Sequence, residues 1–317
     1  EIRQTQGGYA REHVRLERGG ELGEALVVTD PAFLPAVREQ VPEARLAGPR
    51  SPRAVVTLVA SAAVGTVAMA AGLYLWGIPA IANAAAMTIP TAWEDQLGRA
   101  VVDNMVSIGD RCDDPESRRA VEAIVETLVA TRQSPYTYRV LISKSSEVNA
   151  CAAPGGHVVV CRGLLEKTRR PEELAGVLAH EIQHVEQRHG TKAIFRELSL
   201  SLIVASMTGD AGSLAKLIDT VGKLGGLGLQ RRDEEEADRE GMRMMLAAEL
   251  DPEGMVGAFK LLEEASGDLP RGLEYLSSHP NTGDRVQALA AMAAGATYQP
   301  RPIRLARPWG EINHPCE

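Results

Sequence analysis

A long run without charge divides this chain and limits how it can fold. From Ala54 to Trp93 the sequence contains no Asp, Glu, Lys or Arg. The first part of the run, Ala54–Trp76, has 23 mostly small and aliphatic residues, enough to cross a hydrocarbon core of about 30 Å as a helix. Tyr74 and Trp76 would then lie at the interface, where amphipathic rings are favoured. We therefore predict a transmembrane helix over residues 54–76.

Two other structures are compatible with the same run. A helix this rich in Ala can instead be buried in a protein core. The uncharged stretch that continues to Trp93 can also form a membrane hairpin, although each of its two spans would be short. Gly77 and Pro79 break the apolar pattern, so we expect the helix to end there.

The charges on either side of the run predict an orientation. Three arginines precede it and two carboxylates follow it, namely Arg45, Arg50, Arg53, Glu94 and Asp95. Basic residues tend to stay on the cytoplasmic side of a membrane. The N-terminal part is therefore expected in the cytoplasm, and everything after residue 90 on the opposite side.

Three further parts surround this run. Residues 1–50 contain turn signals and a strand-like segment, and because the chain starts at Glu1 rather than Met we expect them to be the remnant of a small β-rich domain. Residues 93–296 alternate helical patterns with short apolar strands, and residues 297–317 form a Pro-rich tail. With 44% hydrophobic but only 4% aromatic residues, we expect an α+β fold, mainly helical, with a small β-sheet.

Charge and cysteine content exclude some functions. The net charge of −8 and the pI near 5.5 offer no broad basic surface, so we expect no nucleic-acid partner. The four cysteines include no CxxC pair, which argues against a structural cysteine–zinc site. They are buried thiols, or some of them are paired. In an oxidising compartment, Cys112 and Cys316 could pair and tie the tail to the domain.

The most chemically informative motif is HEIQH at residues 180–184. It lies in a segment that we expect to be helical from Pro171 to Gly190. Two histidines four residues apart on a helix project from the same face, so His180 and His184 can each offer a nitrogen to one zinc ion. Glu181, next to the first ligand, can take a proton from water at the metal.

A catalytic zinc ion needs a third protein ligand, and an acidic helix at 230–250 supplies candidates. Glu234 and Asp238 are one turn apart on the same face. We predict that Glu234 is the third ligand and that Asp238 accepts the other ring N–H of a ligand histidine. Glu235 and Glu236 are expected in solvent. The alternative for the whole run is an acidic, solvent-facing helix surface.

Three other histidines need an assignment. His279 precedes a proline in a loop, with Arg285 just beyond; it can point into a cleft and stabilise an oxyanion, or it can lock the loop onto the helices. His189 lies nine residues after His180, on the opposite side of a continuous helix, so we expect it at the surface. For His157, in the segment after a Pro-Gly-Gly turn, a position at a strand edge is expected.

Taken together, these motifs resemble those of the membrane-associated zinc metallopeptidases grouped with HtpX, the CAAX prenyl endopeptidases and the mitochondrial OMA-type proteases. The resemblance covers roughly residues 95–290. It rests on Asn149-Ala150, Pro154-Gly155-Gly156 and the strand to Cys161, Gly163-Leu164-Leu165, Glu173 to Glu181, His184, Glu234 to Asp238, and Ser278-His279-Pro280 with Arg285. A Trp93-Glu94 pair after Ile89-Pro90 is similar to the bacterial branch that has a small N-terminal domain and one hydrophobic segment.

The resemblance implies a gluzincin-type zincin fold with one Zn²⁺ per chain, bound near Asp238 and Arg285. It also implies that a polypeptide substrate adds as a β-strand to the edge formed after the Pro-Gly-Gly turn. The substrate-binding residues expected there are Asn149, Gly155, Gly156, His157 and Val158. The site departs from the family at Gln183, where Gly is usual, which removes no ligand.

The function expected from these motifs is zinc-dependent endopeptidase activity on extended or misfolded membrane or envelope proteins, with Glu181 as base and His279 as a further catalytic residue. The expected location is the bacterial inner membrane, with one span and a periplasmic catalytic domain. The alternative is a membrane-tethered zinc protein, chaperone-like or latent, that turns over little substrate.

Overall fold

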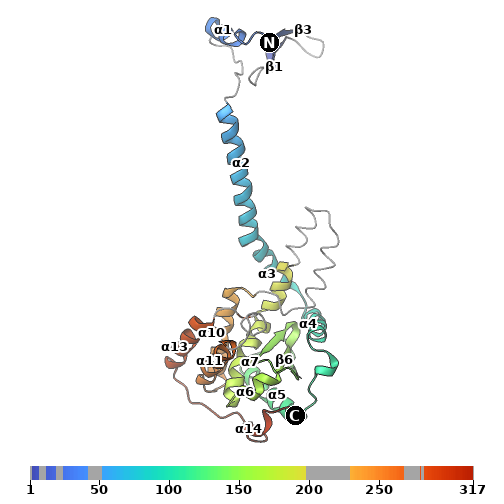
Figure 1. Cartoon of the computed structure of the whole chain (residues 1–317), viewed down its shortest axis with the longest axis vertical. Helices are drawn as coiled ribbons and strands as arrows, with labels where there is room; N and C mark the ends of the chain where they lie inside the picture. The colour runs from blue at the N-terminus through green and yellow to red at the C-terminus, as the bar shows by residue number, and fades with distance from the viewer. Residues whose placement is uncertain are drawn as a thin grey trace. The chain divides into compact units, whose positions relative to one another are not determined.

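A computed structural model gives the architecture of the chain and describes residues 2–6, 12–18, 24–41, 52–197, 229–267, 279 and 282–316. The chain forms two compact units, Glu1–Leu75 and Trp76–Glu317. Its described residues are mainly helical and form two small sheets (Figure 1). The predicted fold class, a mainly helical α+β protein, is therefore confirmed.

The first unit begins with a three-stranded antiparallel sheet and one helix. Its elements are β1 (Ile2–Gln6), β2 (Val14–Arg18), β3 (Glu24–Val28) and α1 (Phe33–Gln40). The middle strand is β2, which pairs with both neighbours. The strand-like segment expected in residues 1–50 corresponds to β3, and the short helix α1 follows it.

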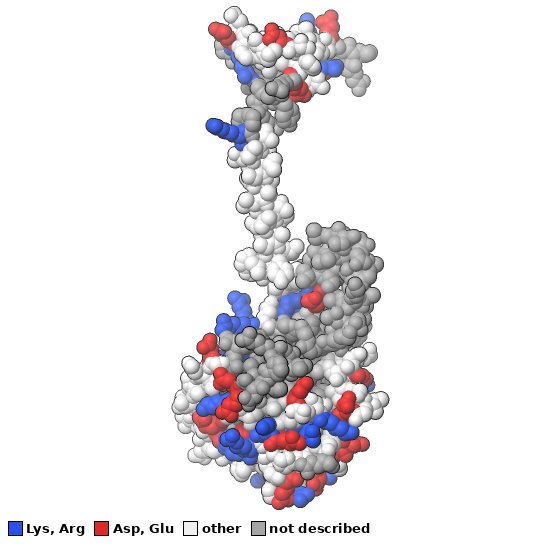
Figure 2. Space-filling model, in the orientation of Figure 1, with Lys and Arg blue, Asp and Glu red and all other residues white. Residues whose placement is uncertain are grey.

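The uncharged run forms one long helix. It comprises α2 (Pro52–Gly72), a π-helical turn η1 (Leu73–Gly77) and α3 (Ile78–Thr88). By length and composition, Val55–Thr88 could cross a membrane, and α2 carries no charge beyond its first turn (Figure 2). Large apolar side chains along α2 are exposed, including Val64, Val67 and Met69. In the described structure, α2 is therefore not the helix of a protein core.

The predicted break at Gly77 and Pro79 does not end this helix. Pro79 occupies the first turn of α3, where a residue without an N–H removes no required hydrogen bond. The π-helical turn before it absorbs the change in hydrogen-bond pattern. One face of α3, made of Ile78, Ala82 and Ala86, is buried in the second unit.

After α3, the second unit continues with two helices and a small mixed sheet. They are α4 (Thr91–Met105), a short 3-10 turn η2 (Ile108–Asp110), α5 (Pro115–Val129), β4 (Arg139–Ser143), β5 (Ala150–Ala153) and β6 (His157–Cys161). The strand order is β4-β6-β5, with β6 parallel to β4 and antiparallel to β5. The Asp114 side chain begins α5 by accepting the N–H groups of Glu116 and Ser117.

This strand order corrects the predicted substrate edge. The strand after the Pro-Gly-Gly turn, β6, is the middle strand, so both of its sides are already paired. The turn itself, η3 (Pro154–Gly156), has positive φ angles at Gly155 (76°) and Gly156 (92°), which glycine adopts at little cost. A Cβ on Gly155 would lie 2.4 Å from Asp95 Cα. The two glycines therefore let the turn pack closely against α4.

The remaining helices surround a buried central helix, α7 (Pro171–Glu186). They are α6 (Arg162–Lys167), α10 (Arg231–Ala247), α11 (Glu253–Gly267), α13 (Thr282–Ala294) and α14 (Trp309–Ile312). The side chains of α7 are buried from Glu173 to Val185, and this helix packs against β5, α10 and α11 (Figure 1). A Cβ on Gly176 would lie 2.3 Å from Met255 Cα, so the glycine permits the close contact with α11.

The end of α7 differs from the prediction. The helix stops at Glu186 rather than at Gly190, Arg188 has a φ of 56°, and a new helical segment begins at His189. This segment is described as far as residue 197. The sequence of 191–208 is apolar enough to predict a core helix, but its remainder and the Gly-rich stretch 209–228 lie outside the described residues.

The C-terminal segment is part of the core rather than a separate tail. Trp309 and Ile312 are buried in the main hydrophobic cluster. The Trp309 indole N–H donates to the Thr168 carbonyl at 3.0 Å. The predicted disulfide between Cys112 and Cys316 is present, with the two Cα atoms 5.9 Å apart.

We expect the Cys316→Ser substitution to lower the free energy of unfolding by about 2–5 kcal/mol. The reason is that the disulfide closes a loop between residues 204 positions apart. Urea denaturation followed by the fluorescence of buried Trp309 would measure the change. A reductant should destabilise the wild type by the same amount and leave the variant unchanged. If the wild type and the variant are equally stable without reductant, the disulfide has no structural role.

Candidate metal centre

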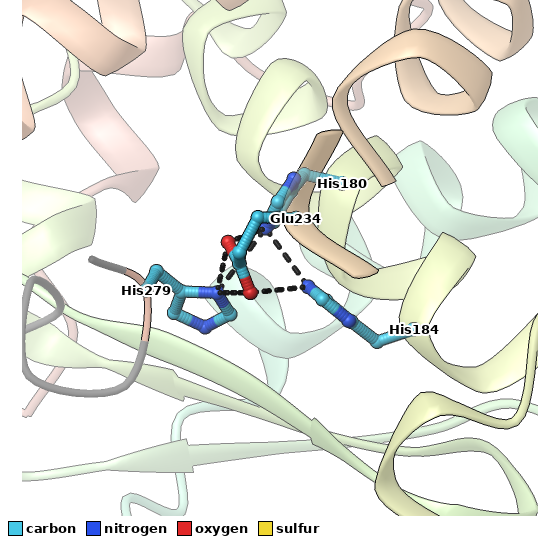
Figure 3. A group of neighbouring side chains, drawn as sticks. All are labelled: His180, His184, Glu234 and His279. Carbon is cyan, nitrogen blue, oxygen red and sulfur yellow. Dashed lines mark hydrogen bonds and ion pairs between the residues drawn. The ribbon is translucent and has the colours of Figure 1, made fainter. Parts of the chain in front are cut away.

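Four buried side chains from three parts of the chain meet beside α7. His180 and His184 come from α7, Glu234 from the first turn of α10, and His279 from the segment before α13 (Figure 3). One potential ligand atom from each residue lies within 4.8 Å of the others. The sequence therefore predicted three of the four members as ligands and the fourth as a nearby group.

The separations of these atoms suit a small tetrahedral ion. His180 Nε2 lies 3.0 Å from His184 Nε2. The Glu234 carboxylate places one oxygen 3.5 Å from His180 Nε2 and the other 3.5 Å from His184 Nε2. With metal–ligand bonds near 2.0–2.1 Å, tetrahedral geometry requires ligand atoms about 3.3–3.4 Å apart. The donor set and its spacing therefore fit zinc.

Local sequence explains why α10 delivers Glu234 at this point. The helix begins with a reciprocal cap, in which the Gln230 and Asp233 side chains bond each other's backbone N–H. Farther along, Gly241 faces α7, where a Cβ would lie 3.1 Å from the backbone nitrogen of His180. The small residue lets the two helices approach, so the carboxylate reaches the histidines.

A second acidic residue of α10 orients the first histidine. Asp238 Oδ1 lies 2.9 Å from His180 Nδ1. Arg285 of α13 holds this carboxylate through two hydrogen bonds, of 2.6 and 2.7 Å, and lies 3.0 Å from Glu234. Burial raises the pKa of Asp238, but the bonds from Arg285 and His180 outweigh it and lower the pKa. Asp238 and Arg285 thus contact the candidate ligands His180 and Glu234.

Burial and charge set the proton affinities of the cluster. Burial lowers the pKa of His180, but its bonds to Asp238 and Glu234 prevail and raise it to about 9. Burial, with the charges of His180 and His279, lowers the pKa of His184 well below its ordinary value. For Glu234, burial raises the pKa, yet hydrogen bonds from His180 and His279 hold it low. The carboxylate therefore stays ionised, as a metal ligand must be.

The side chain of Glu181 lies between the metal cluster and the sheet. Its Oε2 accepts the Ala152 N–H of β5 at 2.9 Å. Its Oε1 is buried, has no hydrogen-bond partner in the described part of the chain, and lies 3.5 Å from His279 Nε2. Burial raises the pKa of Glu181. A carboxylate with one free buried oxygen and a raised pKa is suited to accept a proton.

His279 lies within the ligand cluster itself. Its Nδ1 is 2.9 Å from Glu234 Oε2 and 3.3 Å from His180 Nε2. This position adds a possibility that the sequence did not suggest, namely that His279 is a fourth ligand and the third to bind through nitrogen. The flanking residues Ser278 and Pro280 lie outside the described residues.

The prediction that His189 is a surface residue is wrong. Its side chain is fully buried, and its Nδ1 lies 3.0 Å from Nδ1 of His184. Its Nε2 lies 3.3 Å from Glu236, whose carboxylate is only partly in solvent. Helical spacing placed His189 on the far side because we assumed a continuous helix. The turn at Arg188 carries the chain back toward the cluster, and no glycine marks that turn in the sequence.

Most of the predicted substrate-binding residues have structural contacts instead. Gly155 and Gly156 form the turn against α4, Val158 is fully buried in β6, and His157 Nε2 bonds Asp95 at 2.9 Å. The His157 side chain is thus buried and not at a strand edge. Asn149 alone adjoins β5, and its buried Oδ1 has no hydrogen-bond partner among the described residues.

Gln183 lies outside the metal cluster. Its side-chain Oε1 accepts a hydrogen bond from Arg132 at 3.2 Å, and its side-chain Nε2 lies 3.7 Å from the sulfur of Met244. It is fully buried on the face of α7 that packs against these residues. The residue therefore serves helix packing, and its departure from the usual Gly does not alter the ligands.

Comparisons with known proteins agree with this geometry. The family model for peptidase family M48 matches residues 115–293. The chain is 27% identical to the beta-barrel assembly-enhancing protease of Escherichia coli strain K12 over 261 residues, which are 78% of this chain and 53% of that protein. It is 28% identical to the mitochondrial metalloendopeptidase OMA1 of Schizosaccharomyces pombe over 173 residues, which are 53% of this chain and 51% of that protein.

The chain spans about half the length of these relatives. The region matched by the family model covers more than half of this chain and includes all four residues of the metal cluster. The protein therefore belongs to peptidase family M48.

Proposed function

We propose that this protein is a zinc-dependent endopeptidase anchored in a bacterial inner membrane. The observation that carries the proposal is the placement of Glu181 beside the buried cluster of two histidines and Glu234. Membership of a metallopeptidase family supports it, as do the names of the relatives, a protease and a metalloendopeptidase.

The proposed ligands are His180, His184 and Glu234, which leave an open position for water or substrate. Zinc held in such a site acts as a Lewis acid on a peptide carbonyl and lowers the pKa of water. Asp238 keeps the hydrogen of His180 on Nδ1, so that the lone pair of Nε2 is the one that would bind the metal. Arg285 compensates the charge of Asp238 in this buried place.

Glu181 is the proposed general base. Its free oxygen accepts a proton from the attacking water and then delivers that proton to the leaving amine. The hydrogen bond from Ala152 holds the other oxygen and so fixes the side chain toward the cluster.

We propose that the substrate adds as a strand to β5 rather than to β6. The Cys161 N–H donates to the Asn149 carbonyl. Because hydrogen-bonded and non-hydrogen-bonded pairs alternate in an antiparallel ladder, the backbone N–H and C=O groups of Ala150 and Ala152 point away from β6. Ala152 already points its N–H toward Glu181. Among the described strands, none pairs with this edge of β5. An extended polypeptide added there would lie beside the general base, with main-chain bonds that demand little of its sequence.

Several observations support the proposed location and substrate class. The apolar helix Val55–Thr88 supports a single span, and the flanking charges favour a periplasmic catalytic domain. The Cys112–Cys316 disulfide suits an oxidising compartment. One relative is named for enhancing β-barrel assembly, so we propose misfolded or unassembled envelope proteins as substrates.

Replacing Glu181 by Gln should lower kcat by about 10²- to 10⁴-fold, because the amide cannot accept the proton. Zinc content should stay at one per chain. Cleavage of unfolded casein by the detergent-solubilised chain, together with metal analysis, would test this. Glu172→Gln in the first turn of the same helix is the matched control and should keep full activity. Unchanged turnover in the Glu181 variant would exclude this mechanism.

Zinc binding to the metal-free protein should release about one proton from His180 at pH 7.5. The raised pKa of this residue, about 9, means that it is still protonated at that pH, and zinc must displace the proton on Nε2. Affinity should therefore increase as pH rises from 7 to 9. Calorimetry in buffers of different ionisation enthalpy counts the protons. Asp238→Asn, which removes charge beside His180, should reduce the count; an equal count in both proteins would contradict this assignment.

A latent protein is a second candidate, and the position of His279 favours it. Its Nδ1 belongs to the same group of atoms as the three proposed ligands. If it binds the metal, four protein ligands fill a tetrahedral site and leave no open position. If His279 instead stabilises the oxyanion, as the sequence predicted, it must not bind the metal.

The His279→Ala variant separates the two roles. If the residue blocks the metal, activity should rise about tenfold or more, as expected for removing about 1.4 kcal/mol of competing ligation, while zinc content stays constant. A loss of activity at constant zinc content would instead support the oxyanion role. His314→Ala, at an exposed position, is the control for losing a histidine.

A further inference from the structure

The two histidines of the HEIQH motif have different partners behind them. Nδ1 of His180 faces a carboxylate, Asp238. Nδ1 of His184 faces another imidazole, with its Nδ1 and that of His189 3.0 Å apart. The two rings are tilted by 67° with their centres 5.0 Å apart. His184 is 4% exposed and His189 fully buried, so solvent does not compete for this contact.

The hydrogen atoms of this pair can be assigned from the geometry. Two nitrogens 3.0 Å apart need one hydrogen between them, since one must donate and the other accept. If His184 binds a metal through Nε2, its hydrogen must be on Nδ1. His189 Nδ1 then accepts, which puts the hydrogen of the neutral His189 ring on Nε2.

The far side of His189 offers an acceptor for that hydrogen. Its Nε2 lies 3.3 Å from Glu236 Oε2 and 3.9 Å from Asp233 Oδ1. Asp233 is held in turn by Arg196 at 3.2 Å. Both carboxylates come from the first two turns of α10, the helix that also carries the proposed ligand Glu234.

Bonds on either side of His189 in the sequence fix its position. Arg188 donates to the carbonyls of Ala86, at 2.6 Å, and Ile89, at 2.9 Å. Thr191 donates to the buried carboxylate of Glu94 at 2.6 Å. The backbone that carries the imidazole is therefore tied to the end of α3 and the start of α4.

We propose that His189 is a positioning residue for zinc binding, which holds the ring of His184 with Nδ1 protonated and Nε2 directed at the metal. Hydrogen bonding then runs from His184 through His189 to Glu236. The inference rests on the zinc site proposed above. It assigns His189 no contact with substrate or metal; it acts through His184 alone.

Two substitutions at this position separate hydrogen bonding from packing. His189→Phe keeps an aromatic ring but removes the acceptor, and should weaken zinc affinity about 10- to 100-fold. His189→Asn places an amide oxygen near the position of Nδ1 and should restore most of the affinity. Zinc competition titrations with a chromophoric chelator on the full-length, metal-free chain would measure both. His314→Phe, at an exposed position, should bind zinc as the wild type does.

The outcomes distinguish this inference from the function on which it rests. Failure of the wild type to bind zinc would overturn the proposed metal site. Normal zinc affinity in a folded His189→Phe protein would overturn the role of His189 alone. Equal weakening by Phe and Asn would also overturn it, because a packing defect would then explain both.

A spectroscopic measurement decides the question even if the Phe variant does not fold. The chain has only 7 histidines, so ¹⁵N-histidine labelling of the zinc-loaded wild type can resolve each tautomer, with His189→Asn and His314→Phe assisting assignment. We expect His184 protonated on Nδ1 and His189 protonated on Nε2. A His189 ring protonated on Nδ1 would contradict the proposal.

Discussion

The contact between α7 and α10 is the constraint on which the rest of this structure depends. One helix brings His180 and His184, and the other brings Glu234 and Asp238, to a place with almost no solvent. Burying an isolated charge is costly, and pairing with hydrogen bonds makes it tolerable. The two helices can therefore pack only in the register that pairs these groups. Gly241 permits that register because any side chain there would meet the backbone of α7.

Arg285 shows how the surrounding fold serves this contact. Its guanidinium bonds Asp238 and lies 3.0 Å from Glu234, so one cation compensates two buried carboxylates. It also lies 5.0 Å above the ring of Phe259, a fully buried residue of α11. α13 is thus connected electrostatically to α10 and by packing to α11. Removing any one of these charges would leave the others without compensation, so the residues behave as a unit and not as independent contributors.

The sequence predicted those parts that depend on local periodicity. Spacing along a helix was enough to place His184 beside His180 and Asp238 below Glu234, and the uncharged run was enough for the apolar helix. Pairing between distant segments was not accessible in the same way. The short apolar run of β6 could not tell a middle strand from an edge strand, because that depends on which strands flank it. His189 was misplaced for a related reason, since a left-handed residue that is not glycine carries no sequence signal for the end of a helix.

The turn at Arg188 also connects parts of the second unit that are far apart in the chain. Arg188 closes the carbonyl end of α3, where the last turn of any helix leaves acceptors without partners. Its guanidinium also lies 3.5 Å from Glu94, which accepts hydrogen bonds from Tyr136 and Thr191. Arg188 therefore holds the end of the apolar helix, and the next residue, His189, contacts His184. Because α7 ends before a sharp turn at Arg188, one short segment can contact both the end of α3 and the ring of His184.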